Sequence, residues 1–86
     1  MAEKQGMNII TERAKTHGCY SLQSALAQDL KRRIRQEGAT LTPQQTEALE
    51  MICVKISRVA CGNANEPDHW QDIAGYALLG CGLSGG

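Results

Sequence analysis

The sequence has few of the residues from which β-sheet cores are built. Phenylalanine is absent, one Trp and two Tyr are the only aromatic residues, and Val and Ile together number eight among 86 residues. Eight scattered β-branched apolar residues are too few for several alternating strands, whereas ten Ala and eight Leu are typical of helices. We therefore expect an all-α fold.

The sequence also lacks a net charge and a long apolar run. Nine Lys or Arg side chains balance nine carboxylates, which argues against nonspecific binding of nucleic acid. The longest apolar segment, residues 73–83, is too short and too rich in glycine to span a bilayer. The first ten residues show no signal-peptide pattern. We expect a cytoplasmic protein that binds neither nucleic acid nor a membrane.

The four cysteines are too widely spaced for a zinc or redox motif, because no C-x-x-C pair is present. Cys53 and Cys61 fall in one expected helix, where the rise between them is about 12 Å, beyond the reach of a disulfide. We interpret all four thiols, including those of Cys19 and Cys81, as structural.

Two segments in the middle of the chain carry apolar residues at helical spacing. Ser21 is a good N-cap for the first segment, which ends before Gly38. Its apolar stripe consists of Leu22, Leu26, Leu30 and Ile34. The second segment begins with Thr42 and Gln45 in a capping box, with proline at the first helical position, and ends at Gly62. Its stripe consists of Leu49, Ile52, Ile56 and Val59.

A further helix is expected after the turn at residues 63–67, with Asn65 or Glu66 as its cap. Its apolar face holds Trp70, Ile73, Ala74, Ala77 and Leu78. We interpret Trp70 as a core or interface anchor, because its large ring buries much apolar surface. Residues 9–17 favour one more short helix. We expect a flexible tail at residues 1–8, one helical domain at 9–79 and a glycine-rich tail at 80–86.

The short links between these helices predict a small bundle of three to four helices around a central antiparallel hairpin. Such helices cannot cover their own apolar stripes, and a chain this short buries only about 60–65% of its surface. Residues 1–43 carry seven basic and four acidic groups, and residues 44–86 carry two and five. The positive half of one chain can therefore lie on the negative half of another. We expect dimerisation to complete the bundle as a homodimer.

Four carboxylates on the last two helices are candidate metal ligands. Glu47 and Glu50 lie three residues apart, and Asp68 and Asp72 lie four apart, so each pair can point toward one spot. Oxygen ligands in this number suit Mg²⁺ or Mn²⁺, which can hold a phosphate chain and activate a water. The same acids are also ordinary on exposed helix faces and near helix N-termini, so both interpretations stay open.

Lys55 and Arg58 lie one turn apart near the end of the second stripe and are candidate phosphate ligands. In an antiparallel hairpin, Asp68 and Asp72 lie closer to these two cations than to Glu47. Ion pairs across the hairpin are therefore the interpretation we favour for both cations.

Four more residues, two of them beside Asp72, can contribute to a site. His69, Asp72 and Tyr76 share the polar side of the last helix, where a hydrogen bond between His69 and Asp72 is either catalytic or structural. His17 and Tyr20 flank Gly18 and a cysteine, which can place an imidazole and a thiol beside a ligand. The sequence shows no Ser/His/Asp or Cys/His arrangement that is typical of a nucleophilic enzyme.

The segments KISR at residues 55–58 and DHWQDIAGYA at residues 68–77, with Arg13, His17 and Tyr20 upstream, resemble an uncharacterised family of small phage and prophage proteins. The resemblance covers residues 11–79. It implies a helical protein that acts in the cytoplasm of a bacterial host, where a host or phage protein is its expected partner. The resemblance implies no particular activity.

A more distant likeness is to the all-α nucleoside triphosphate pyrophosphohydrolases of the MazG type, which bind magnesium through E-E-x-x-E and a later E-x-x-D. Glu47 and Glu50 match the last two acids of the first motif, with Thr46 in place of the first. Asp72 matches the last acid of the second motif, with His69 in place of its Glu. This likeness implies, as the alternative to a protein-interaction module, magnesium-dependent release of pyrophosphate from a nucleotide.

Overall fold

The computed structural model describes residues 19–37 and 40–82, and every element in these ranges is a helix. The helices are α2 (Tyr20–Gln36), α3 (Pro43–Cys61) and α4 (Pro67–Cys81). Since no strand occurs in the described ranges, the all-α class is confirmed for them. The short helix expected at residues 9–17 and the tail expected at residues 1–8 lie outside the described residues.

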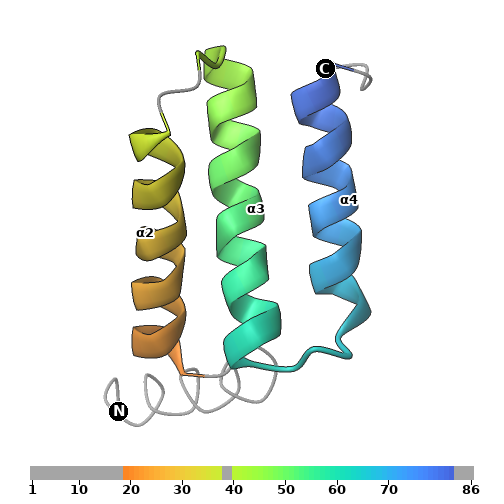
Figure 1. Ribbon diagram of the computed structural model, residues 1–86. Helices are drawn as coiled ribbons and strands as arrows, with labels where there is room; N and C mark the ends of the chain where they lie inside the picture. Colours follow the sequence, from red (N-terminus) through yellow and green to blue (C-terminus); the bar gives the residue numbers. More distant parts are fainter. Residues whose placement is uncertain (1–18, 38–39, 83–86) are drawn as a thin grey trace, which may run out of the picture.

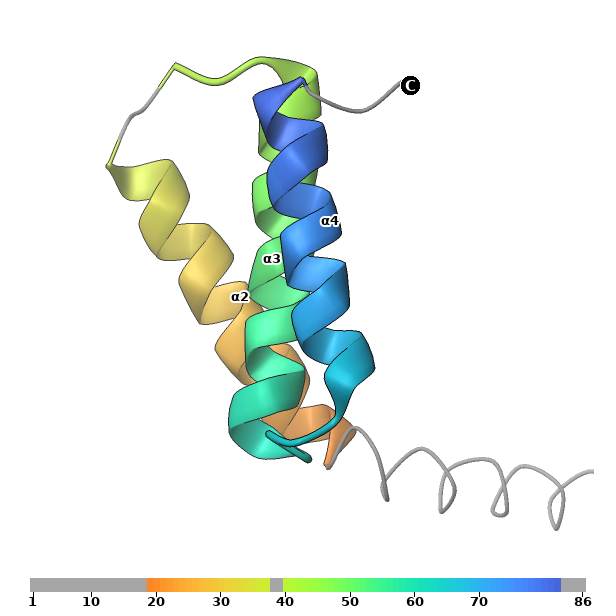
Figure 2. The same cartoon turned by 90° about the vertical axis from the view of Figure 1, so that its right-hand side faces the viewer.

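The three helices lie side by side in one layer, with α3 in the middle (Figure 1). Helix α3 packs against both neighbours, whereas α2 and α4 make little contact with each other. The chain direction alternates, so α3 and α4 form the antiparallel hairpin that the sequence predicts. A view turned by 90° shows that α2 crosses α3 and diverges from it toward Gln36, while α4 follows α3 along its length (Figure 2).

Helix α2 begins two residues earlier than an N-cap at Ser21 predicts. Its N-cap is Cys19, which has an extended backbone. The Cys19 carbonyl accepts the first hydrogen bond of the helix, from the amide of Gln23 at 3.0 Å. No side chain caps this end, and Ser21 lies in the first turn with its hydroxyl 3.1 Å from the Cys19 thiol. The prediction of Ser21 as N-cap is therefore wrong, because the chain already turns into the helix at Tyr20.

The capping box at the start of α3 is confirmed. The amide of Gln45 donates to the Thr42 hydroxyl at 3.1 Å, and the amide of Thr42 donates to the Gln45 side chain at 3.0 Å. Pro43 occupies the first helical position, where its missing N–H costs nothing. The helix ends before Gly62, as its apolar period predicts.

Helix α4 is capped by Glu66, one of the two residues expected there, whose carboxylate accepts from the amide of Asp68 at 3.4 Å. The helix extends to Cys81, two residues past the expected end at residue 79. Gly80 therefore lies inside the helix, against Ala48 of α3. Gly82, with a left-handed φ of 83°, ends it.

The interior of this layer is small and polar. The buried apolar residues in the described ranges are Ala27, Ala48 and Cys53. The buried polar or charged residues are Gln23, Lys55, Ser57 and His69. Large apolar side chains that are exposed instead are Tyr20, Leu22, Ile56, Trp70, Leu78 and Leu79. The described helices therefore leave much of their apolar stripes uncovered. None of these helices has the length and apolar character needed to cross a membrane.

Gly75 and Gly80 both lie inside α4 but differ in the space beside them. A Cβ at Gly75 meets nothing within 4 Å, whereas a Cβ at Gly80 lies 3.2 Å from the Cβ of Ala48. Gly75→Ala should raise the free energy of unfolding by about 0.8–1 kcal/mol through helix propensity. Gly80→Ala should gain less or lose stability, because Ala48 must give way by a few tenths of an ångström.

Urea unfolding followed by circular dichroism, at one protein concentration, measures both variants. Equal gains at the two positions would show that α3 and α4 do not approach closely at Gly80.

Candidate functional site

A buried ammonium group pairs with a carboxylate across the α3–α4 hairpin. The Nζ atom of Lys55 lies 2.9 Å from Oδ2 of Asp72, with side-chain exposures of 10% and 47%. The hydrogen bond from Lys55 lowers the pKa of Asp72, and the charges of Lys55, His69 and Arg58 lower it further. The ion pair expected across the hairpin is thus confirmed for Lys55, whose predicted role as a phosphate ligand has to compete with Asp72.

His69, Asp72 and Tyr76 share one side of α4, as their spacing predicts, but this side faces α3 rather than solvent. His69 is 2% exposed, and Tyr76 is half-buried along α3. The reason is tertiary: the ion pair of Asp72 and the close approach at Gly80 turn this side of the helix inward. The apolar side of α4 is correspondingly turned outward.

The four carboxylates predicted as magnesium ligands are not gathered in one place. Oε2 of Glu50 lies 3.6 Å from the Arg35 guanidinium of α2, while Asp72 is held in its own ion pair. Glu47 and Asp68 lie toward opposite ends of the antiparallel hairpin. Residues 19–37 and 40–82 contain no group of three or more His, Cys, Asp or Glu that could hold a metal ion. The magnesium site stays a prediction without support from this geometry.

Arg58, the other predicted phosphate ligand, has different neighbours from Lys55. It lines an open cleft of about 160 Å³ between α2 and α3. The opposite wall of this cleft includes Lys31, Gln23 and Tyr20 of α2. Arg58 thus shares a cleft with Lys31 of α2, and its role as a phosphate ligand stays a prediction.

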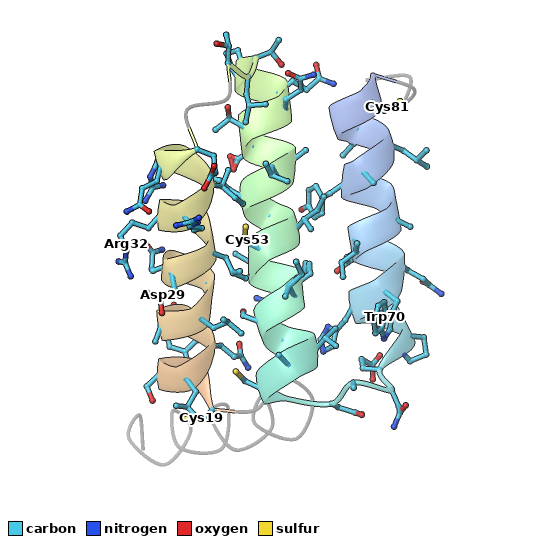
Figure 3. The ribbon with its side chains drawn as sticks, in the orientation of Figure 1. Cys19, Asp29, Arg32, Cys53, Trp70 and Cys81 are labelled. Carbon is cyan, nitrogen blue, oxygen red and sulfur yellow. The ribbon has the colours of Figure 1, made fainter. Side chains whose placement is uncertain are left out.

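Trp70 is not a core residue of the single chain. Its indole Nε1 donates to the backbone oxygen of Ala64 in the preceding turn at 2.7 Å, which ties the ring to the base of α4 (Figure 3). The residue is nevertheless 54% exposed. Its role as an interface anchor stays a prediction. Tyr20 is exposed at the first position of α2, and His17 lies outside the described residues.

All four cysteine thiols are free. Cys19, Cys53 and Cys81 lie on three different helices or their ends (Figure 3). Burial raises the pKa of the Cys53 thiol, which fits a structural role in the core. A hydrogen bond with Ser21 lowers the pKa of the exposed Cys19 thiol.

Sequence reasoning missed Lys31 and Gln23 as site residues. Lys31 stands in a run of basic residues at 31–35 whose charges look alike in the sequence. The signal was its spacing: Gln23, Ala27 and Lys31 follow one another at four-residue intervals, and the first two are buried against α3. Only the packing of α2 on α3 tells which basic residue of the run faces the cleft.

Asp72→Asn should lower stability at neutral pH, because the buried Lys55 ammonium then lacks its carboxylate. The pKa of Asp72 is lowered from 3.8 in the folded state. The stabilisation is therefore complete above this value and is lost as pH falls through the folded pKa. The difference in Tm between wild type and variant should be largest near pH 7 and vanish in acid.

The control is Lys55→Met combined with Asp72→Asn, which removes both charges and should be more stable than Asp72→Asn alone. Thermal unfolding across this pH range measures all three chains. A Tm difference that does not change with pH would contradict the ion pair.

Comparison with known proteins identifies the family but no activity. Residues 3–84 match a domain of unknown function, DUF6378. No curated protein and no solved structure matches the chain. The likenesses to phage proteins and to MazG-type enzymes are not tested by this match and stay predictions. Because the match covers nearly the whole sequence, the chain belongs to the DUF6378 family.

Proposed function

We propose that this protein is a helical interaction module that acts as a homodimer. The observation that carries the proposal is an apolar face on one surface of the three-helix layer. We define this apolar face as the side chains of Leu22, Leu26, Leu30, Leu49, Ile52, Ile56, Trp70, Ile73 and Ala77.

The contacts of α3 place its part of the apolar face. Ala48 and Lys55 point toward α4, where they meet Gly80 and Asp72. Leu49 follows Ala48, and Ile56 follows Lys55, so each is turned about 100° around the helix from its neighbour. Both side chains therefore project from one surface of the layer rather than toward α4.

The flanking helices present apolar side chains on the same surface. Leu49 and Ile52 of α3 line a shallow groove with Ala77 of α4, and Trp70 and Ile73 share the Ala77 side of α4 by helical spacing. On α2, Ser24 lines the cleft on the other surface, and Leu22 and Leu26 each lie about 200° around the helix from it. The three stripes therefore converge on one surface.

A second copy is the occupant that the chemistry of the layer favours. Within the described residues, Leu22, Ile56 and Trp70 are 61%, 40% and 54% exposed. Taking a side chain of this size from full exposure to full burial contributes about 1.5–3 kcal/mol, and burying the part still exposed here contributes a fraction of that. Contiguous apolar surface marks interaction sites. Two such layers stacked face to face form the two-layer arrangement in which helices bury their stripes.

The net charges of the two outer helices are opposite, which is compatible with self-association. Helix α2 carries four Lys or Arg and one Asp, whereas α4 carries two Asp and no Lys or Arg. A twofold axis parallel to α3 places α2 of each copy over α4 of the other. At each edge of such a dimer a helix of net positive charge then lies over a helix of net negative charge, with the basic residues in the C-terminal half of α2 and both Asp in the N-terminal half of α4. The likeness to phage proteins adds a host or phage protein as the further partner of this module.

Sedimentation equilibrium tests the proposal, since the dimer has twice the chain mass of 9.3 kDa. Ile56→Glu and, separately, Leu22→Glu should shift the mass to that of one chain, because dimerisation would bury an unpaired carboxylate. The matched control is Leu79→Glu. Leu79 is 37% exposed, close to the 40% of Ile56, but lies about 200° around α4 from Ala77.

Circular dichroism of each variant confirms that the helices are retained. A wild-type chain that sediments as a monomer at micromolar concentration, or a Leu79→Glu variant that dissociates as fully as Ile56→Glu, would contradict the proposal.

A further inference from the structure

We propose that the cleft between α2 and α3 binds the phosphate group of a small phosphorylated molecule. The site consists of Lys31 and Gln23 on α2 and Arg58 on α3, with Tyr20 at one end. It lies on the surface opposite the apolar face, because Ile56 and Arg58 project about 200° apart from α3. The inference therefore stands independently of dimerisation.

The first argument is the distribution of ion pairs. Arg32 pairs with Asp29, Arg33 with Glu37, Arg35 with Glu50 and Lys55 with Asp72. Within residues 19–37 and 40–82, Lys31 and Arg58 are the Lys and Arg side chains without an ion pair. Both line the same cleft, from opposite walls.

The second argument is the absence of a neutralising group in the walls of the cleft. None of the described residues that line it is an Asp or Glu. The nearest candidates are already engaged: Glu50, which lines a neighbouring hollow with Lys31, pairs with Arg35. Asp72, whose pKa the charge of Arg58 helps to lower, pairs with Lys55. Among the described residues, the cleft thus presents two cations that no Asp or Glu pairs with.

The third argument is a buried donor without an acceptor. Gln23 is 5% exposed, and its side-chain Nε2 has no hydrogen-bond partner in the part of the chain that the structure describes. The neighbouring Ser57 is satisfied, because its hydroxyl donates to the backbone oxygen of Val54 at 2.6 Å. Buried donors in folded proteins nearly always have acceptors. An anion oxygen supplies one when the Gln23 amide, which is shielded from solvent here, turns toward the cleft that the residue lines.

The donor set and the size of the cleft define the ligand class. A guanidinium offers a bidentate fork to an oxyanion, an ammonium offers a point charge, and an amide N–H adds a neutral donor. The volume of about 160 Å³ is smaller than the roughly 300–1,000 Å³ of pockets that enclose a whole drug-sized ligand. The cleft holds a phosphate group, while the rest of the ligand extends past the exposed ring of Tyr20.

Titration of the ¹⁵N-labelled full chain followed by NMR tests the proposal. Inorganic phosphate and glucose 6-phosphate should both give saturable shifts in the Gln23 side-chain NH₂ and in amides near Lys31 and Arg58. Glucose, and chloride at matched ionic strength, should give none. If only inorganic phosphate binds, the site takes the free ion, and the claim of a phosphorylated molecule is overturned.

Lys31→Gln and Arg58→Gln should each weaken phosphate binding about tenfold or more, because each removes a charged hydrogen-bond donor. The matched control is Arg32→Gln, which removes the same charge from the outer edge of α2, where Arg32 pairs with Asp29 (Figure 3). Gln23→Leu should weaken binding while leaving the fold intact, since it removes a donor that is unsatisfied without ligand. Equal weakening by Arg32→Gln, or shifts spread evenly over the basic surface, would overturn the site.

Discussion

The contact between α3 and α4 determines the rest of this structure. The ion pair of Lys55 with Asp72 and the close approach of Gly80 to Ala48 turn one side of α4 toward α3. That side also carries His69 and is largely polar. Because α4 is turned this way, its apolar side, with Trp70, stays in solvent. A small polar interior and a large exposed apolar surface follow from this single orientation.

The layer that results has two surfaces of different chemistry. One combines the apolar stripes of all three helices and is suited to a second layer. The other has a cleft in which, within residues 19–37 and 40–82, Lys31 and Arg58 form no ion pair and the Gln23 amide nitrogen has no acceptor. An interaction module that recognises a phosphorylated molecule on one surface and its own copy on the other uses both. Both surfaces include residues of α3. Substitutions on one side of this helix should therefore affect dimerisation, and substitutions on the other side should affect phosphate binding.

Local signals predict the helices well and their orientation poorly. The capping box of Thr42 and the glycine at position 62 define α3 from the sequence alone, because caps depend on neighbouring residues. The orientation of α4 depends on Lys55, which is distant in sequence, so the side of His69 and Tyr76 was predicted as polar surface rather than as interior. The magnesium site illustrates the same limit, because spacing within a helix does not tell which ends of two helices meet. Lys31 could be separated from its basic neighbours only by the packing of α2.

The central claim is that the apolar face contacts the same face of a second copy. Isotope-filtered NMR on a mixture of labelled and unlabelled full-length chains tests it most directly. The account predicts intermolecular contacts at the methyl groups of Ile56 and at the indole of Trp70. Contacts from these two side chains that arise only within one chain would contradict it.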